Sequence, residues 1–530
     1  MSPQQLFRRK LGYLLMIGVL ALLLLWMGQP ATSATKGAKD SPGGVLARLR
    51  SHYRLSQAEL GDIDPTSVTI KLSTLGLRGI AANILWAKAT DYQMRKDWAN
   101  RAAVLKQITK VQPNFINVWI NQAWNVSYNI AVQFRDDYRE RYRWIIKGFD
   151  FLKEGMVYNR REPRLQYELG RMVSQKIGKA DESKQYRRLF KQDDDFNAGV
   201  ELALRDNWLV GRKWYELAIN MVETMGVTMM GQSPLIYRSS GPLCLMSYAD
   251  AIERDGTFGE VAQTAWVNAS EDWRRFGNFE LPTSFMLDDK PVLIRLNEQE
   301  QEEAESRKLV AQLEAIEPGL RDKIIAEKKA SLTKAQREAM DIPSEKRTPK
   351  QLGLAYQAEL AVATTHDELA RRITGPNRKK AIELARKAAE HDQIAQTIRS
   401  NRMVVNFDYW RSHAKTEQSG QVLTARKLVY QADRKAAEGE LTAARDAYRD
   451  GFRAWRRVID AYPDYLMEQT ANEDLVDAIQ RYHRTLSQLD EKFPKPFILQ
   501  DVIDQYRRQH QEVQDEAPAK TKKPAPKKAK

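Results

Sequence analysis

Apolar side chains recur every three or four positions along most of the chain after residue 75, and this spacing constrains the fold more than any other feature. It is the period at which side chains line up on one face of an α-helix. The clearest run, spaced 4-3-4-3-4, consists of Tyr138, Tyr142, Ile145, Phe149, Leu152 and Met156. The pattern predicts an all-α protein in which each amphipathic helix buries one face.

The same period predicts the buried faces of other helices, and helix-breaking residues predict where those helices end. One buried face is expected to carry Ile80, Ile84, Trp86 and Tyr92. Breaks are expected at Pro113, Asp136, Asp137, Pro163 and Gly178. These breaks predict helices of about 15 to 20 residues joined by short turns. Such helices would form an array of antiparallel hairpins.

Repeated features indicate that these hairpins stack. Pro163 is followed by Leu169 and Gly170, and near the C-terminus Trp455 precedes Pro463 in a similar pattern. These stretches resemble tetratricopeptide repeats (TPRs), in which a Leu-Gly pair lets two helices approach and a proline ends the second helix. The resemblance covers residues 98–191 and 428–466. It implies a TPR-like α-solenoid of stacked hairpins.

The N-terminal half is expected to be one helical domain with one irregular insertion. Residues 45–285 are predicted to form this TPR-like domain, in which only residues 64–74 have strand character. Gly, Ser and Pro accumulate at residues 226–242 and predict a loop. Irregular segments on helical arrays often carry specificity, so this loop is a candidate for function, with a packed cap over a groove as the alternative.

Two further parts are predicted beyond this domain. Residues 286–347 are rich in Glu, Gln, Lys and Ala and are interrupted by a Pro-Gly pair at position 318, which predicts a charged helical hairpin or spacer. This segment is either a coiled-coil partner site or a solvated spacer. Thr348 and Gln351 can form a capping box, so residues 348–512 are expected to be a second helical domain.

An uncharged run, residues 11–28, lies near the N-terminus. At about 1.5 Å per residue such a helix nearly matches the hydrocarbon core of a bilayer, so we expect one transmembrane helix. Three basic residues at positions 8–10 precede it. They place the N-terminus in the cytoplasm and the body, after a linker at residues 29–44, on the extracytoplasmic side of the cytoplasmic (inner) membrane. A signal peptide cleaved near residues 31–34 is the alternative, and it gives the same compartment.

The net charge of +15 is concentrated at the two ends of the chain. Residues 517–530 hold six lysines among alanine and proline, which predicts a disordered tail from about residue 513. The body between the two ends is nearly balanced and does not suit a nucleic-acid-binding surface. Outside the cytoplasm the tail is expected to attract anionic lipid or an acidic envelope polymer, unless it serves only to solubilise the chain.

The sequence offers no group of residues typical of an active site. One cysteine and six histidines exclude a disulfide framework, a thiolate zinc site and a histidine-rich metal cage. Three aspartates at residues 193–195 fit a solvated helix end better than a metal site, because no histidine accompanies them. The arginine clusters at residues 160–164 and 187–188 are either a site for an acidic ligand or, as favoured here, the outer face of a helix pair. Without a phosphate-binding glycine loop or a nucleophile elbow, we expect no catalytic, cofactor-binding or metal-binding residues and no cofactor.

The chain also loosely resembles a bacterial family labelled "iron responsive element" proteins, which have a single membrane anchor and a helical body. The residues that carry this resemblance are 74–86, TLGLRGIAANILW, and the Pro-Asn-Phe turn at residues 113–115. The resemblance implies the architecture, and its label implies iron or RNA. The residues do not supply iron ligands, since no two histidines lie within ten positions and no Glu-x-x-His motif occurs.

Two functions from different classes fit these observations. The first is a membrane-anchored scaffold, not an enzyme, whose concave helical surface binds a protein partner at the cell envelope. The alternative is an extracytoplasmic carbohydrate-binding protein or enzyme that uses exposed tryptophans as stacking platforms. The first is favoured because four tryptophans lie on predicted core stripes. They are Trp119, Trp144, Trp266 and Trp455.

Overall fold

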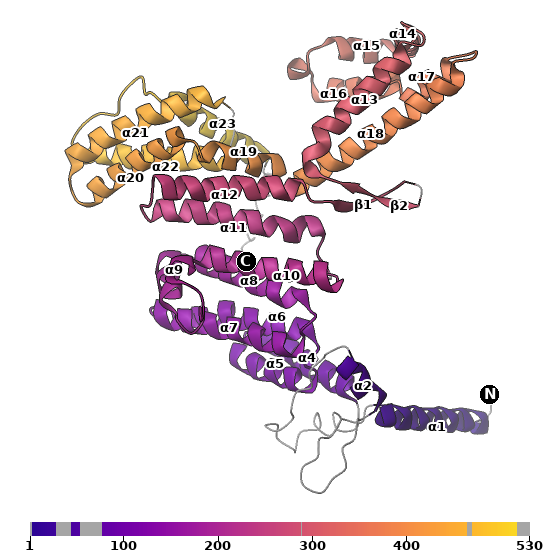
Figure 1. The fold of residues 1–530 in the computed structure, drawn as a ribbon, viewed down its shortest axis with the longest axis vertical. Coiled ribbons are helices and arrows are strands. Elements are labelled where there is room, and N and C mark those ends of the chain that lie inside the picture. The colour runs from indigo at the N-terminus through magenta and orange to yellow at the C-terminus, as the bar shows by residue number, and fades with distance from the viewer. Residues whose placement is uncertain are drawn as a thin grey trace, which may run out of the picture. The chain divides into compact units, whose positions relative to one another are not determined.

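The computed structural model describes residues 3–27, 44–52, 77–229, 231–287, 289–463 and 469–516. The chain divides into two compact units, Met1–Ala269 and Ser270–Lys530, and each is built almost entirely of helices (Figure 1). The predicted all-α fold class is confirmed. The stretch with strand character at residues 64–74 and the lysine-rich residues 517–530 lie outside the described residues.

The first unit is a series of helices joined mostly by short turns. Its described elements are α1 (Pro3–Met27), α2 (Val45–His52), α4 (Arg78–Met94), α5 (Trp98–Val111), α6 (Ile116–Trp124), the π-helix η1 (Asn125–Ile130), η2 (Ala131–Gln133), α7 (Tyr138–Tyr158), α8 (Pro163–Gly178), α9 (Ser183–Gln192), η3 (Leu202–Leu204), α10 (Asn207–Met225) and α11 (Pro234–Arg254). The helix α12 (Glu260–Gly277) begins in this unit and continues into the second.

Neighbouring helices of the first unit pack as pairs, α4 with α5, α6 and η1 with α7, and α8 with α10 (Figure 1). The helix starts follow from capping. The Asp137 carboxylate accepts hydrogen bonds from the backbone N–H groups of Arg139 (2.8 Å) and Glu140 (3.1 Å), and α7 begins directly after it. The predicted breaks are therefore confirmed. The stripe on α7 is also confirmed, since its central residues are buried, namely Tyr142, Ile145, Phe149 and Leu152.

The predicted buried face of α4 is wrong for two of its four residues. Ile80 and Ile84 are each 52% exposed, whereas the buried residues of α4 are Ala81, Ala82, Leu85 and Ala89. Because alanine has the smallest side chain that still favours a helix, an alanine face lets the backbone of α5 approach closely. The contact is thus made on the small-residue side of α4, and the two isoleucines point away from it.

A close helix crossing lies where Leu169 and Gly170 were expected to allow one. A Cβ atom added to Gly170 of α8 would lie 2.9 Å from the carbonyl oxygen of Gly211, and one added to Gly211 of α10 would lie 3.0 Å from the carbonyl oxygen of Gly170. Each glycine therefore makes room for the backbone of the other helix. The tight contact predicted at this pair is confirmed, with α10 as the partner helix.

The loop predicted at residues 226–242 is much shorter in the structure. The helix α11 begins at Pro234, in the first-turn position where a missing N–H costs nothing, and continues through Pro242 to Arg254. Leu235, Tyr237 and Cys244 are buried along it, so tertiary packing outweighs the penalty of an interior proline. Residues 234–242 of the predicted loop are therefore part of a packed helix, and the irregular part lies between α10 and α11.

The helix α1 is 25 residues long, and the large apolar side chains described between residues 11 and 24 are exposed. Counting only the residues that the structure describes, no helix is long and apolar enough to cross a membrane. The transmembrane helix predicted for residues 11–28 is therefore not confirmed.

The second unit is also helical, apart from one hairpin. Its elements after α12 are β1 (Leu281–Leu287), β2 (Lys290–Ile294), η4 (Leu296–Glu298), α13 (Gln299–Glu314), α14 (Leu320–Ser331), α15 (Lys334–Asp341), η5 (Ser344–Lys346), α16 (Pro349–Val362), α17 (His366–Arg372), α18 (Arg378–Val404), α19 (Phe407–Glu417), α20 (Gly420–Ala437), α21 (Leu441–Ala461), α22 (Gln469–Gln488) and α23 (Gln500–Glu516). The helices α13 and α18 pack along each other, as do α20 and α21 (Figure 1).

The predicted helix boundaries of the second unit are mostly confirmed. Thr348 and Gln351 form the capping box that starts α16, and Gly319, with φ of 81°, separates α13 from α14. The antiparallel strands β1 and β2, paired from Leu281 with Ile294, were not predicted. The last helix continues to Glu516, beyond the predicted tail boundary at residue 513.

Candidate functional site

The polar clusters noted in the sequence have structural roles. The α9 helix ends at Gln192, and Asp193 accepts hydrogen bonds from the Tyr142 hydroxyl (2.8 Å) and the Phe196 backbone N–H (2.9 Å). Burial, together with the charge of Asp193, raises the pKa of Tyr142 well above its ordinary value. Arg187 pairs with Asp206 and Asp255. Within the described residues, no group of three or more His, Cys, Asp and Glu side chains is arranged to hold a metal ion.

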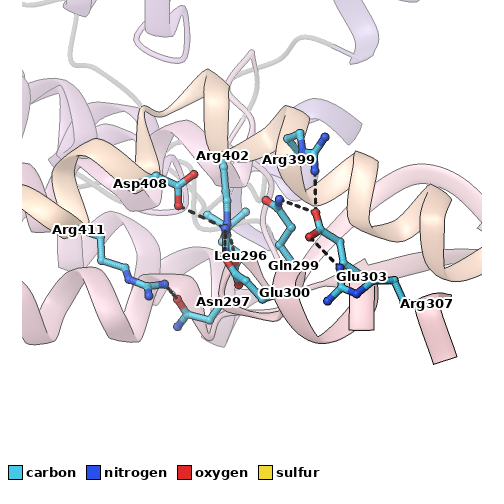
Figure 2. A network of polar contacts seen from close by, with 10 residues as sticks. All are labelled: Leu296, Asn297, Gln299, Glu300, Glu303, Arg307, Arg399, Arg402, Asp408 and Arg411. Carbon is cyan, nitrogen blue, oxygen red and sulfur yellow. Dashed lines mark hydrogen bonds and ion pairs between the residues drawn. The ribbon is translucent and has the colours of Figure 1, made fainter. Parts of the chain in front are cut away.

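A network of ion pairs joins α13, α18 and α19 in the second unit (Figure 2). Arg402 of α18 is only 4% exposed, and its two terminal nitrogens donate to the Glu300 carboxylate at 2.7 and 3.0 Å. Its Nε donates to the carbonyl oxygen of Leu296 (2.7 Å), and Asp408 lies 3.3 Å away. The hydrogen bonds from Arg402 lower the pKa of Glu300. A bidentate pair of this kind fixes geometry.

A second part of the network lies one turn further along α13. Glu303 accepts hydrogen bonds from Arg399 (2.7 Å) and from the Gln299 side chain (3.0 Å), and Arg307 lies 3.9 Å away (Figure 2). Each of the carboxylates drawn there therefore has an arginine partner. The network links α13, α18 and α19 and acts as a clamp between these helices.

An open pocket of about 310 Å³ lies beside this clamp. It is lined by Ser306, Arg307, Val310, Ala311, Glu314, His366 and Asp392. The His366 Nε2 lies 2.8 Å from Asp392, and its Nδ1 lies 3.4 Å from a terminal nitrogen of Arg321. Because a guanidinium can only donate, Nδ1 accepts and the ring proton lies on Nε2. Both ring nitrogens of His366 therefore have polar partners within the described residues.

The helices α6 and η1 of the first unit present an uncharged aromatic surface. Residues 116–133 contain no charged side chain. Trp124 is 41% exposed and stacks on Tyr128, with ring centroids 5.2 Å apart. The Lys176 amino group lies 4.5 Å from the centroid of the Tyr128 ring. Burial lowers the pKa of Lys176 and raises that of Tyr128.

Buried polar groups fix the backbone beneath this surface. Asn125 and Ser127 are fully buried, and the Ser127 hydroxyl donates to the carbonyl oxygen of Ile145 on α7 (3.1 Å). Gly148 of α7 admits this hydroxyl, because a Cβ atom there would lie only 2.1 Å from it. These contacts accompany the π-helix, a rare form that is frequent at functional sites.

Charged side chains of α8 border the aromatic surface. Arg164 donates to the Asn117 side chain (3.0 Å), and Arg171 pairs with Glu168 at 2.6 Å. The surface therefore has an aromatic centre at Trp124 and Tyr128, with charged side chains of α8 around it. We call this surface the α6–α8 face. It consists of Asn117, Asn121, Trp124, Tyr128, Arg164, Glu168, Arg171 and Lys176.

Most of the tryptophans with a predicted core position are buried. Trp119, Trp266 and Trp455 are buried, and Trp144 is partly buried. The indole N–H of Trp119 donates to the carbonyl oxygen of Pro113 (2.7 Å), and that of Trp266 donates to Glu253 (2.5 Å). Their ring faces are thus part of the core. Trp124 had no separate prediction, and the absence of charge over residues 116–133 is the sequence feature that points to it.

No protein-family model and no curated protein matches the chain.

Proposed function

We propose that the protein is a membrane-anchored scaffold whose stacked, TPR-like helical hairpins bind a protein partner at the cell envelope. The observation that carries the proposal is the α6–α8 face. An exposed Trp124 stacked on Tyr128, on a helix without charges, leaves apolar surface that a partner would cover. Aromatic and arginine side chains together are the residue types that contribute most to protein interfaces.

The rim of the α6–α8 face supports the same proposal. Arg171 pairs with Glu168, and Arg164 is held by Asn117, so these side chains are ordered before a partner arrives. Preorganisation lowers the entropy cost of binding. Stacked helical hairpins provide extended surfaces of this kind for peptides and helices.

The proposed anchor is α1 with the apolar residues 11–28. Large apolar side chains exposed around a helix are unfavourable in water, at about 25 cal/mol per Å². Basic residues at positions 8–10 would hold the N-terminus in the cytoplasm, which places the body outside it. The proposed location is therefore the cytoplasmic membrane, with a single pass.

Partner binding at the α6–α8 face can be tested by photo-crosslinking in cells. A photo-crosslinking amino acid in place of Asn121 is expected to give one discrete protein adduct. The adduct should weaken at least about tenfold when Trp124→Ala and Tyr128→Ala remove the aromatic surface. The matched control is the same crosslinker in place of Lys184, exposed on α9. The same adduct from Lys184, or an undiminished adduct in the double variant, would count against the proposal.

The anchor can be tested by membrane extraction. The full-length chain is expected to stay in the membrane pellet after carbonate treatment at high pH, because removing a buried apolar helix from lipid is costly. Deletion of residues 3–27 should move the protein to the supernatant. Release of the intact full-length chain by carbonate would contradict the anchor and leave the α6–α8 face unaffected as a proposal.

A further inference from the structure

Arg101 of α5 is a buried arginine without a partner among the described residues. It is only 5% exposed, and its Nε is sealed from solvent without a hydrogen-bond acceptor. No ion pair or side-chain hydrogen bond of Arg101 is found in the described part of the chain. This contrasts with Arg402, which is equally buried and makes a bidentate pair with Glu300.

The nearest carboxylate along the helix does not serve Arg101. Asp97 lies one turn earlier, and its two oxygens accept the backbone N–H of Asn100 (3.2 Å) and the Asn100 side-chain amide (2.7 Å). Asp97 is thus used as the N-cap of α5. It makes no ion pair with Arg101 within the described residues.

Further buried polar groups lie on the helices that pack against α5. The Gln122 side-chain nitrogen donates to the carbonyl oxygen of Ala102 (3.4 Å), while its oxygen Oε1 has no partner. The Asn125 side-chain nitrogen lies 3.5 Å from the carbonyl oxygen of Trp98. The junction of α5 with α6 and η1 therefore holds an arginine and two amides in an otherwise apolar core.

A largely buried guanidinium without an anion is costly, because burial removes part of its water and no counter-charge replaces it. Of the guanidinium nitrogens of Arg101, only Nε is buried without a partner, so an anion can reach the terminal nitrogens. Burial lowers the pKa of Arg101, with no carboxylate acting in the other direction. An anion that reaches Arg101 from outside would supply the missing counter-charge. The planar fork of N–H groups in arginine matches the two oxygens of a carboxylate.

We propose that Arg101 is a binding subsite for a carboxylate carried by the protein partner. The residual exposure of Arg101 gives such a group access to it. The amides of Gln122 and Asn125 lie against the α5 backbone at Ala102 and Trp98, so Arg101 is close to α6 and η1, the elements that also carry Trp124 and Tyr128. That a protein partner carries the carboxylate rests on the proposed function. That Arg101 binds a carboxylate does not.

The first test is the stability of the purified full-length chain in chloride buffer. Arg101→Met replaces the guanidinium with a shorter, uncharged and unbranched side chain. It is expected to raise the melting midpoint of the first unit by at least about 2 °C, because it removes an uncompensated buried charge. Arg188→Met, at an exposed position of α9, is the matched control and should leave the midpoint unchanged. A fall in the midpoint of Arg101→Met would overturn the proposal.

The second test uses sodium acetate as the carboxylate probe against sodium chloride at equal ionic strength. Acetate is expected to raise the midpoint of the wild type by more than that of Arg101→Met, since only the wild type binds it at this site. Arg101→Lys keeps the charge but loses the fork, and should lose most of the selective shift. Equal acetate shifts in wild type and Arg101→Met would overturn the site.

Sodium phosphate distinguishes the class of anion. A selective shift as large with phosphate as with acetate would overturn the carboxylate assignment. The outcome also separates the two proposals. If no adduct forms at position 121 but acetate stabilises the wild type selectively, the proposed function fails and the carboxylate site stands.

Discussion

Replacing Glu417 with alanine is expected to lower the free energy of unfolding of the second unit by about 3–5 kcal/mol, the usual cost of breaking a buried ion pair from one side. Glu417 ends α19 and is fully buried. Its two oxygens accept hydrogen bonds from Arg426 of α20 at 2.8 and 2.6 Å, and the His413 ring lies 3.6 Å away. The substitution removes the carboxylate that compensates these groups in the core.

A matched control lies at the end of α20. Glu438 pairs with Arg434 at 2.8 Å, but both side chains are largely exposed. Glu438→Ala should therefore change the free energy of unfolding by less than about 0.5 kcal/mol. Urea denaturation followed by circular dichroism measures both variants. Similar losses of unfolding free energy in Glu417→Ala and Glu438→Ala would show that burial of Glu417 does not increase the contribution of its ion pair to stability.

The second large effect is expected at the glycine crossing of the first unit. Gly170→Leu should lower the free energy of unfolding by about 1–3 kcal/mol or more, because the new side chain would overlap the neighbouring helix. Its Cβ atom alone would lie 2.9 Å from the carbonyl oxygen of Gly211 and 3.1 Å from the Tyr215 ring. Backbone atoms of α10 cannot move aside as a flexible side chain would, so α8 and α10 would have to separate.

The control for this substitution is Gly353→Leu in α16. Nothing lies within 4 Å of a Cβ atom added to Gly353, so the leucine meets no neighbour. The higher helix propensity of leucine should then raise the stability of the second unit by about 0.5–1 kcal/mol. The melting midpoint of each variant gives the comparison. A midpoint for Gly170→Leu that matches the wild type would show that α8 and α10 are not in close contact.

The sequence predicts a helix and its buried face well where the three-to-four spacing of large apolar residues is regular. The stripe on α7 is buried as predicted because large apolar residues occupy most positions of its inner face. The prediction failed on α4, where Ile80 and Ile84 have the right spacing but Ala81 and Ala82 make the contact. Spacing reports which residues share a face, and it does not report how closely the partner helix approaches.

Other differences come from interactions that are distant in sequence. Pro242 is accommodated inside α11 because Tyr237 and Cys244 are buried on both sides of it, which a local rule against helical proline cannot anticipate. The β1–β2 hairpin was missed because Pro282 and Pro291 argue against strands, although a two-stranded hairpin leaves one edge of each strand free.

The candidate sites were the least predictable part of the molecule. Arg101 is one of many arginines in the sequence, and only the packing of α5 against α6 and η1 distinguishes it as buried without a partner. The exposure of Trp124 is likewise set by which neighbours the helix acquires. A pattern of charge and spacing contains neither fact, since both depend on the tertiary contacts.

Cys244 lies fully inside the first unit, and burial raises the pKa of its thiol to about 12. Almost none of it is thiolate near neutral pH, and the thiolate is the form that reacts with maleimides and other alkylating reagents. A cysteine introduced at an exposed position would therefore be the one thiol that such reagents modify. Spectroscopic labels for distance measurements within either unit can be attached in this way, without first replacing the native cysteine.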